Sequence, residues 1–436
     1  MASEAISIIE ARNRVLQASK PLGHETVAVE QALDRVLAQD VRAAGDVPPF
    51  ASSAMDGYAL KAGPAGRRLR VIGESRAGAP AADTLESDEA IRISTGAAVP
   101  PDADAVIRQE DVDTVPRQRG TTTTTPHADT TTTTPHDDIA AGIRGRDVDI
   151  AKQVIVTKVA LATGENVRGA GEDMRAGSLV LRAGITVRAA ELGAAVAGGV
   201  GELVVARRPT VAVLATGDEL RAPGEPLGPG QIHNSNAPML AALAIHSGAV
   251  VLPAQRLADD RAATEASLAA ALEQAEVVIV SGGVSVGPHD HVKPALANLG
   301  VREHFWRVAL QPGGPTWFGE RDGRLVFGLP GNPVSAFVTF SLFAVPALAA
   351  MQGATADEMP ASEAILGVAV ARNRTREQAL RVRLERRGAT IVAFPNGPQG
   401  SHILTSLVGA DALALIAPGP DEAPAGITVA LEYLPR

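Results

Sequence analysis

Residues 209–353 alternate short apolar runs with longer helical patterns, and this alternation restricts the possible folds more than any other feature of the chain. The apolar runs have the length of buried strands and lie at 211–214, 249–252, 276–280 and 325–327. Helical patterns lie at 234–247, 261–274, about 290–299 and from Val334 onward. Strands that alternate with helices predict a doubly wound, mostly parallel α/β sheet.

The other parts of the chain carry different patterns. Apolar residues at helical spacing predict helix in residues 1–40. Short β-like runs at 69–72 and 90–93, punctuated by Gly and Pro, predict a β-rich domain. In the tail, residues 380–384 alternate strictly, which predicts a strand with one buried and one solvent-facing side in a small C-terminal β-domain.

The composition excludes several classes of chemistry. The chain has 436 residues, enough for about three domains, and no cysteine, so disulfides, thiolate metal sites and cysteine nucleophiles are excluded. Its 49 acidic and 40 basic residues give a net charge of −9, which argues against nucleic acid as a partner. If the protein binds anions, it must do so through the local arrangement of its groups and not through the electrostatic field of its net charge.

No segment predicts export or membrane insertion. The first residues carry Glu4, Glu10, Arg12 and Arg14 among apolar ones, unlike a signal peptide. The apolar stretch Ala336–Met351 is shorter than the ~20 residues of a membrane span and predicts a buried helix. We therefore expect a cytoplasmic protein without a membrane partner.

Residues 121–138 form a tandem nine-residue repeat, TTTTTPHAD followed by TTTTTPHDD. The repeat is polar and has no core-forming residue, so it predicts a disordered surface insertion. The alternative is weak metal binding by its histidines and aspartates, which are His127, Asp129, His136, Asp137 and Asp138.

Three loops rich in small residues follow strands of the predicted α/β sheet. They are TGDEL (216–220), SGGVSVG (281–287) and GLPGNPVS (328–335). Small residues let an anion approach backbone N–H groups, and the carboxyl ends of parallel strands meet at one edge. Each loop is a weak signal by itself, but together they predict a crevice for phosphate or an oxyanion.

Carboxylates cluster in the same loops, at Asp218, Glu219 and Asp290, and Asp259 follows another strand. A phosphate site that also holds carboxylates indicates magnesium. The alternative is that Asp218 or Asp290 only caps a helix.

The motifs together, in this order, closely resemble the molybdopterin molybdenumtransferase family, which is related to the catalytic domain of gephyrin. The matching segments are PPFASSAMDGYA (48–59), RISTGAAVP (92–100), NVRGAGEDMRAG (166–177), TGDEL, SGGVSVG, GLPGNPVSA (328–336) and QGSHI (399–403). They span nearly the whole chain apart from the Thr-rich repeat.

The resemblance implies four domains and a homodimer. Domain I would comprise 1–48 and 167–207, the inserted β-rich domain II 49–166, the molybdopterin-binding α/β domain III 208–353, and the β-domain IV 354–436. The active site would lie between protomers, with the α/β crevice of one facing the β-rich domain of the other.

The resemblance also implies the reaction. Family members insert molybdenum from molybdate into adenylylated molybdopterin, with magnesium, and release AMP. A transient contact with the upstream adenylyltransferase is expected. Two other hypotheses are a non-catalytic molybdopterin-binding scaffold and a tungstate-selective homologue.

Residue by residue, the resemblance assigns two sets of site positions. The catalytic set is Asp56, Thr95, Asp173, Glu219, Asp259 and Asp290, with Glu219 and Asp290 as magnesium ligands. The substrate-binding set is Thr216, Gly217, Ser281, Gly282, Gly283, Ser285, Lys293, Pro330, Gly331, Asn332, Pro333 and Ser335. Alternatively, Pro330 and Pro333 only shape a turn, and Asp173 only caps one.

This chain departs from the family pattern at four positions. Ala215 stands where many members have Ser, Asn234 where many have Asp, and Gln311 and Gly314 where many have Lys. These changes remove charges of both signs near the predicted site.

Overall fold

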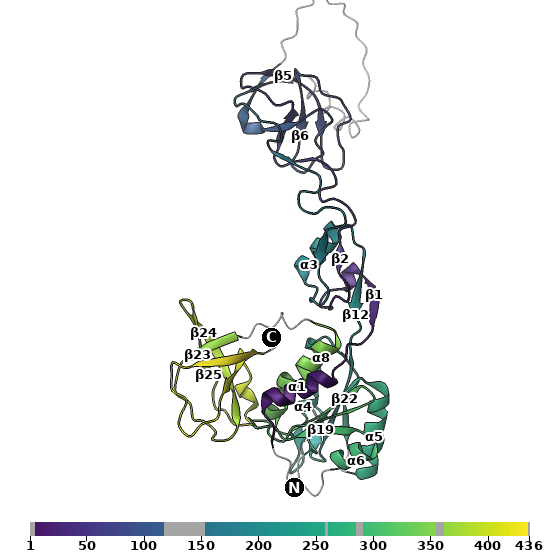
Figure 1. Ribbon diagram of the computed structural model, residues 1–436, viewed down its shortest axis with the longest axis vertical. Coiled ribbons are helices and arrows are strands. Elements are labelled where there is room, and N and C mark those ends of the chain that lie inside the picture. The colour runs from purple at the N-terminus through teal and green to yellow at the C-terminus, as the bar shows by residue number, and fades with distance from the viewer. Residues whose placement is uncertain (1–4, 117–152, 258–259, 285–290, 355–361, 435–436) are drawn as a thin grey trace, which may run out of the picture. The chain divides into compact units, whose positions relative to one another are not determined.

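The computed structural model describes residues 5–116, 153–257, 260–284, 291–354 and 362–434. The chain divides into two units, shown together in Figure 1. Unit 1 comprises Met1–Asp40, Arg182–Leu192 and Glu202–Arg436, and unit 2 comprises Val41–Leu181 and Gly193–Gly201. The Thr-rich repeat at 121–138 lies outside the described residues, so the two interpretations of it remain untested.

A seven-stranded sheet forms the centre of unit 1, in the order β16-β13-β18-β22-β21-β19, with β17 also paired to β13. Its strands are β13 (Thr210–Thr216), β16 (Val250–Val251), β17 (Gln255–Leu257), β18 (Val277–Ser281), β19 (Arg302–Trp306), β21 (Trp317–Arg321) and β22 (Arg324–Leu329). The pairings among β13, β16, β17, β18 and β22 are parallel. Strand β21 pairs antiparallel with both β22 and β19. The predicted mostly parallel sheet is confirmed.

Helices cover both faces of this sheet, as successive residues of β13 show. Val211 and Val213 belong to an apolar cluster with α4 (Asn236–His246), whereas Ala212 and Leu214 belong to a second cluster with α5 (Arg261–Gln274) and α6 (Val292–Asn298). A strand buried on both faces has no polar side, which is why its sequence reads as a continuous apolar run. The sheet is therefore doubly wound, as predicted.

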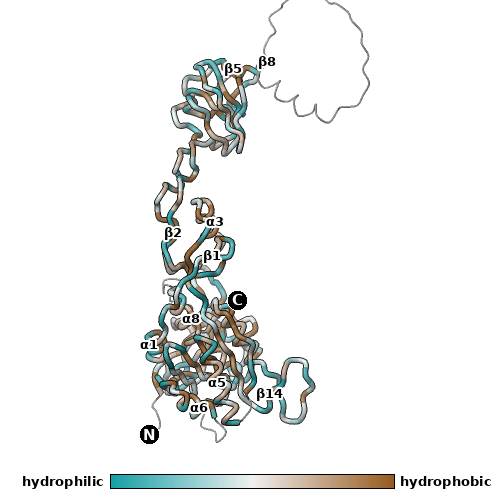
Figure 2. Tube along the Cα trace, turned by 90° about the vertical axis from the view of Figure 1, so that its right-hand side faces the viewer, coloured by the Kyte–Doolittle hydropathy of each residue, from teal (hydrophilic) through white to brown (hydrophobic). Residues whose placement is uncertain are grey.

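The long apolar helix after β22 is built in three parts. These are α7 (Pro333–Thr339), a π-helical turn (Phe340–Ala344) and α8 (Val345–Met351). By length and composition alone the run Pro333–Met351 could cross a membrane, but 67% of it is buried inside the protein. Phe340, Phe343 and Leu348 are fully buried in the first cluster, and Figure 2 shows the apolar colour of α8. The prediction of a buried core helix is confirmed.

The helix predicted over residues 1–40 is much shorter than expected. Helix α1 runs over Ile8–Ala18, with the Ser7 side chain capping its first turn, and it packs into the first apolar cluster. Pro21 and Gly23 then interrupt helical backbone. The chain continues as β1 (His24–Ala28), which pairs with β12 (Glu202–Ala206).

Beyond β1, the apolar residues Ala32, Val36 and Leu37 are buried without being helical, whereas Leu33 is exposed. The segment has one 3₁₀ turn, Val29–Gln31, and Leu37 forms a β-bridge with Val205. Leu37 is 1% exposed, so its burial comes from a strand contact and not from a helix face. The helix predicted from the spacing of apolar residues at 32–37 is therefore wrong, because this segment pairs with residues that are distant in the sequence.

Unit 2 contains a six-stranded sheet in the order β7-β4-β6-β5-β9-β8. Its strands are β4 (Gly57–Leu60), β5 (Arg68–Ser75), β6 (Glu89–Ile93), β7 (Ala105–Arg108), β8 (Val112–Pro116) and β9 (Gln153–Thr157). A 3₁₀ turn at Gln109–Asp111 joins β7 to β8. Both strands predicted at 69–72 and 90–93 are present, and the β-rich domain is confirmed.

Short elements complete unit 2 and its borders. β3 (Ser52–Ser53) pairs with β10 (Val167–Arg168), and β2 (Val41–Arg42) pairs with β11 (Leu179–Leu181). Helix α3 covers Ala189–Ala197.

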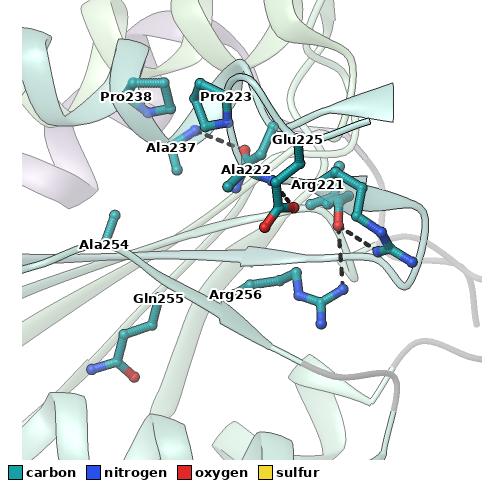
Figure 3. A pocket seen from close by; sticks show the side chains of 11 residues that line it. Arg221, Ala222, Pro223, Glu225, Ala237, Pro238, Ala254, Gln255 and Arg256 are labelled. Atoms are coloured by element: carbon teal, nitrogen blue, oxygen red, sulfur yellow. Dashed lines mark hydrogen bonds between the residues drawn. The ribbon is translucent and has the colours of Figure 1, made fainter. Parts of the chain in front are cut away.

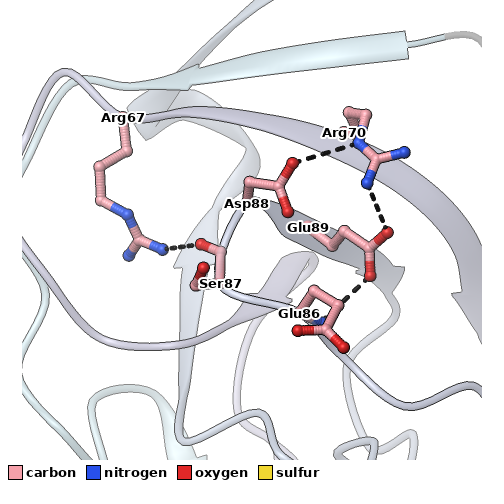
Figure 4. Close-up of polar contacts among 6 residues, drawn as sticks. All are labelled: Arg67, Arg70, Glu86, Ser87, Asp88 and Glu89. Carbon is pink, nitrogen blue, oxygen red and sulfur yellow. Dashed lines mark hydrogen bonds and ion pairs between the residues drawn. The ribbon is translucent and has the colours of Figure 1, made fainter.

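The turn that leads into β6 is held by polar contacts at the surface (Figure 4). Arg70 Nε and Nη2 lie 3.3 Å and 2.9 Å from carboxylate oxygens of Asp88 and Glu89, and the Glu86 N–H donates to Glu89 at 3.1 Å. Arg67 donates to the Ser87 carbonyl at 2.7 Å. Exposed ion pairs contribute only about 0–1 kcal/mol each, so their role is to shape this turn.

The C-terminal strands close into a small barrel in the order β20-β24-β25-β23-β27-β26, with β24 also paired to β26. The strands are β20 (Leu310–Gln311), β23 (Ser362–Leu366), β24 (Glu377–Arg387), β25 (Thr390–Pro395), β26 (Ala412–Ile416) and β27 (Thr428–Tyr433), and a 3₁₀ turn covers Leu404–Ser406. The predicted small C-terminal β-domain is confirmed.

Strand β24 corrects the expectation of a solvent-facing side at 380–384. Arg381, predicted to face water, is fully buried, as is its neighbour Val382. The loop after β25 covers that side of the strand, since Arg381 donates from Nε to Ser406 Oγ at 3.1 Å and from Nη2 to the Gly400 carbonyl at 3.2 Å. Arg381 is therefore hydrogen-bonded inside the protein and does not face solvent, although the alternating pattern predicted the reverse.

Candidate active site

Three loops begin side by side at the carboxyl edge of the unit 1 sheet. Strands β13, β18 and β22 are parallel neighbours, with Ala215 opposite Ser281 and Ser281 opposite Leu329. Thr216 and Gly217 therefore lead out of the sheet beside Gly282 and Pro330. The structure thus brings together the loops TGDEL, SGGV and GLPGNP, which the sequence places about 50 to 110 residues apart.

The backbones of these loops approach closely because glycines occupy the contact positions. Gly282 has φ +87°, and a Cβ there would lie 2.6 Å from Thr216 Oγ1. Gly283 has φ +66°, and a Cβ there would lie 2.7 Å from the Val292 side chain. The Gly282 N–H donates to the Leu329 carbonyl at 2.9 Å, which ties the second loop to the third. Glycine is therefore required at both positions for the second loop to pack against Thr216 and Val292.

Glu219 lies over the turn of the first loop. Gly217 has φ +140°, and the Glu219 carboxylate occupies the space that a side chain at 217 would take. The Glu219 backbone carbonyl accepts from the Ile232 N–H at 2.9 Å, so the loop is anchored below an exposed carboxylate. This arrangement leaves the carboxylate available to a cation.

Asn236 is a member of the site that the sequence analysis did not assign. From the first turn of α4 its Nδ2 donates to Ser281 Oγ at 2.8 Å and to the Gly331 carbonyl at 2.7 Å. Its Oδ1 is buried and has no hydrogen-bond partner among the described residues. A buried acceptor without a partner costs about 1–3 kcal/mol, so this atom is suited to a ligand's donor or cation. The sequence signal that could have identified Asn236 is its position at the start of the helix that follows the first strand of the α/β sheet.

The third loop is held by the C-terminal barrel. Asn332 Nδ2 donates to Ser401 Oγ at 3.2 Å, and the Val334 N–H donates to the Ser401 carbonyl at 3.2 Å. Pro333 occupies the first turn of α7, where its missing N–H has no cost, and Pro330 is buried. Ser335 is 4% exposed, on the buried side of α7. The QGSH segment at 399–402 therefore packs against the PGNP segment at 330–333.

Arg381 supports that QGSH segment from inside the barrel. Its backbone N–H donates to Gln399 Oε1 at 2.9 Å, and Gln399 Nε2 donates back to the Arg381 carbonyl at 3.2 Å. Burial lowers the pKa of Arg381 to about 10, so the guanidinium stays charged at neutral pH. Its Nη1 is buried without a partner among the described residues. The sequence analysis missed this residue because its pattern placed it in solvent.

Lys293, expected to contact phosphate, lies against an aromatic ring. Its Nζ is 3.6 Å from the centroid of Trp306, a cation–π distance. The Trp306 Nε1–H donates to the Val284 carbonyl at 3.1 Å, beside the Gly-rich loop. Ser285, Asp290 and Asp259 lie outside the described residues, so their assigned roles are untested.

Asp56 and Thr95 meet in unit 2. Strand β4, which follows Asp56, pairs with β6, which precedes Thr95, with Gly57 opposite Ile93. Asp56 Oδ1 accepts from the Thr95 N–H at 2.7 Å and from the Thr95 hydroxyl at 3.0 Å. The Thr95 N–H, then its hydroxyl, and more weakly Arg92, hold the pKa of Asp56 below its usual value of 3.8. The exposed Asp56 carboxylate is therefore ionised at neutral pH.

Asp173 lies elsewhere in unit 2, in the loop after β10. Its backbone N–H donates to the Val47 carbonyl at 3.0 Å, and its side chain is exposed. The contact fixes the backbone of a turn, so both interpretations of Asp173 stay open.

The four departures from the family pattern each have a described local environment. Asn234 Oδ1 accepts from the Ala237 N–H at 3.1 Å and so caps the start of α4. Ala215 is 1% exposed and packs in the first apolar cluster. Gln311 accepts from Asn373, and Arg376 Nη1 lies 3.7 Å from where a side chain at Gly314 would begin.

Comparisons with known proteins cover almost all of the chain. Family models match at 6–199 (MoeA N-terminal region, domain I and II), 212–350 (probable molybdopterin binding domain) and 363–434 (MoeA C-terminal region, domain IV). Molybdopterin molybdenumtransferase 2 of Mycobacterium tuberculosis is 35% identical over 411 residues, covering 92% of this chain and 91% of that protein.

This chain belongs to the molybdopterin molybdenumtransferase family. The Haemophilus influenzae molybdopterin molybdenumtransferase is 32% identical over 434 residues, covering 98% of both chains. The crystal structure of a molybdopterin biosynthesis MoeA protein from Pyrococcus horikoshii has a TM-score of 0.74 and 29% identity, over 99% of both chains. The resemblance seen in the motifs and the multidomain fold are thereby confirmed.

Proposed function

We propose that this chain transfers molybdenum from molybdate to adenylylated molybdopterin and releases AMP. The observation that carries the proposal is the meeting of three Gly-rich loops at one edge of the sheet, where glycines allow the loop backbones to pack closely. Relatives along the whole chain bear the name molybdopterin molybdenumtransferase. A chain with net charge −9 binds its anions through local dipoles.

The crevice offers two kinds of anion site. The turn at Gly282 and Gly283, beside the first turn of α4, suits the phosphates of the substrate. The contact between the PGNP and QGSH segments suits molybdate, because the buried Arg381, which donates to Gly400, is cationic and its Nη1 has no partner among the described residues. Guanidinium hydrogen bonds to oxyanions are among the strongest in proteins.

Magnesium fits the oxygen atoms present. The Glu219 carboxylate lies over Gly217, and Asn236 Oδ1, at the start of α4, is an oxygen acceptor with no partner in the part of the chain that the structure describes. Magnesium usually takes one or two carboxylates and the substrate's phosphates, so a dedicated acidic cluster is not required. When bound, the ion would offset negative charge on the phosphoanhydride and favour its cleavage. The loop at Gly282 and Gly283 would hold the phosphates, and the PGNP and QGSH segments would hold the oxyanion beside them.

The proposal includes a homodimer in the cytoplasm. Asp56 and Thr95 of the partner subunit would face the crevice of the first protomer, as the family resemblance implies. The carboxylate of Asp56 is kept ionised and oriented by Thr95, as such a role requires. A transient contact with the upstream adenylyltransferase would deliver the adenylylated substrate.

The test is release of AMP from adenylylated molybdopterin in the presence of molybdate and magnesium. The folded wild-type protein should release AMP, and Glu219→Gln should lower the rate by about tenfold or more, since it removes a charge from the metal site. Glu422→Gln, an exposed glutamate in the C-terminal β-domain, serves as the matched control. Binding of the substrate without AMP release would instead identify a scaffold and overturn the proposal.

A further inference from the structure

A cavity of about 550 Å³ is lined by residues of the segment that follows Glu219, of the start of α4 and of β17. The segment after β14 (Leu220–Arg221) extends from the body of unit 1 (Figure 2), and β14 pairs with β15 (Ile232–His233). This segment forms one wall, and Ala254 to Arg256 form the opposite one (Figure 3). The volume is that of a small-molecule site.

The cavity has apolar sides and a charged end. Pro223, Pro238 and Ala237 contribute flat apolar surface, whereas Glu225, Arg221 and Arg256 contribute charge. This combination suits a flat heteroaromatic ring with hydrogen-bonding groups along its edge.

The charged groups are held in place by the backbone. Arg221 Nη1 donates to the Leu220 carbonyl at 2.8 Å, and Arg256 Nη1 donates to the same carbonyl at 3.2 Å. Glu225 Oε2 accepts from the Ala222 N–H at 2.9 Å. No described residue hydrogen-bonds Glu225 Oε1. The carboxylate is therefore oriented but keeps acceptor capacity.

The cavity and the crevice share the start of α4. Asn234 and Ala237 line the cavity, and Asn236 between them binds Ser281 and Gly331 of the crevice loops. Leu220, another lining residue, directly follows Glu219. A ligand with a ring in the cavity can therefore place its phosphates at the Gly-rich loops.

We propose that this cavity binds the pterin ring of the substrate, with Glu225 as its specificity-determining residue. The inference rests on the proposed function, since that function supplies a substrate containing both a pterin and an adenine. A pterin has two adjacent N–H donors on its amino-pyrimidinone edge, and one carboxylate accepts both. Its carbonyl and ring nitrogen accept from the guanidinium groups. Adenine presents a donor beside an acceptor on its pairing edge, so it cannot donate twice to Glu225.

The experiment is a fluorescence titration of the full-length protein with free pterin. Wild type should bind pterin, and AMP in excess should not displace it. Glu225→Gln should raise the Kd for pterin by about tenfold or more, because its amide meets the pterin's donors with a donor of its own. Its amide oxygen can still accept from the Ala222 N–H, so the loop is preserved. Glu422→Gln should bind as wild type.

A second variant fills the cavity from an exposed position. Ala254→Trp should abolish pterin binding while the thermal midpoint stays within a few degrees of wild type, since Ala254 is solvent-exposed. Displacement of pterin by AMP, or equal pterin affinity in wild type and Glu225→Gln, overturns the assignment. AMP release by wild type, measured separately, tells failure of this cavity apart from failure of the proposed function.

Discussion

Asn236 joins two loops that lie 45 and 95 residues further along the chain, through one amide group. The side chain satisfies both loops with its two N–H donors and leaves its oxygen without a partner among the described residues. If Asn236 only linked the two loops, its oxygen would be expected to have a hydrogen-bond partner, because an unpaired buried acceptor is destabilising. The residue therefore combines a structural and a ligand-binding role.

Replacing Asn236 with alanine tests the structural part. Asn236→Ala removes two hydrogen bonds and should lower the free energy of unfolding by about 1–3 kcal/mol. Asn298→Ala is the matched control, because Asn298 makes one exposed hydrogen bond, to Glu265, on the same α/β domain. Urea unfolding of both variants gives the comparison, and an equal loss in the two would refute a special role for residue 236.

The pair Asp56 and Thr95 gives a pH prediction. The Thr95 N–H and hydroxyl lower the folded-state pKa of Asp56, so the ionised carboxylate stabilises the fold above its unfolded pKa. This stabilisation is lost as the pH falls through the lowered folded pKa. Thr95→Val removes the hydroxyl but keeps the N–H, so the pKa of Asp56 should rise and remain below 3.8.

NMR titration of the Asp56 carboxyl carbon measures this shift directly. Thr114→Val, at an exposed threonine of β8 in the same sheet, should leave the titration unchanged. An unchanged pKa in Thr95→Val would show that the hydroxyl hydrogen bond is absent in solution.

At the scale of elements, the Gly-rich turn after β18 depends on two separate properties of glycine. Gly282 requires a positive φ, and it also lies where a Cβ would meet Thr216. Gly300 has φ +75°, but a Cβ there would meet no atom within 4 Å, so it shares the first property only.

Alanine at each position separates the two effects. Gly300→Ala should cost about 1 kcal/mol from backbone strain alone. Gly282→Ala should cost more, by about 1–3 kcal/mol of steric overlap, and should also weaken binding of AMP. Thermal unfolding and AMP titration provide the measurements, and equal behaviour of the two variants would contradict the close contact with Thr216.

The sequence predicted secondary structure best where the burial of a segment is decided by its own hydrophobic pattern. The runs at 211–214 and 276–280 became β13 and β18, because strands covered on both faces are apolar throughout. The pattern failed at Leu37 and Arg381, where partners distant in sequence decide burial. The loops of the crevice were visible as motifs, but Asn236 and Arg381 were not, since their roles arise from contacts with those loops.

At the scale of the whole molecule, the motifs fall in two units: Asp56 with Thr95 in one, and Glu219 in the other. The four-domain division and the homodimer remain predictions from the resemblance. A site shared between two protomers has a direct biochemical consequence, because a dimer of two differently mutated chains can contain one intact site.

Mixed dimers provide that test. Asp56→Asn and Glu219→Gln should each retain about a tenth or less of the wild-type rate alone. Dimers formed from equal amounts of both should reach about a quarter of the wild-type rate of AMP release. Asp56→Asn mixed with Thr95→Ala should recover nothing, because every site then carries a defect. No recovery in the first mixture would place both groups in the site of one chain.

The central claim is that the crevice loops hold molybdate and the phosphates of adenylylated molybdopterin. A crystal structure of the protein with both ligands tests it most directly. We predict oxyanion density beside Pro330–Ser335 and phosphate density at Ser281–Gly283. Clear density for either ligand away from these loops, in crystals of the active protein, would contradict the account.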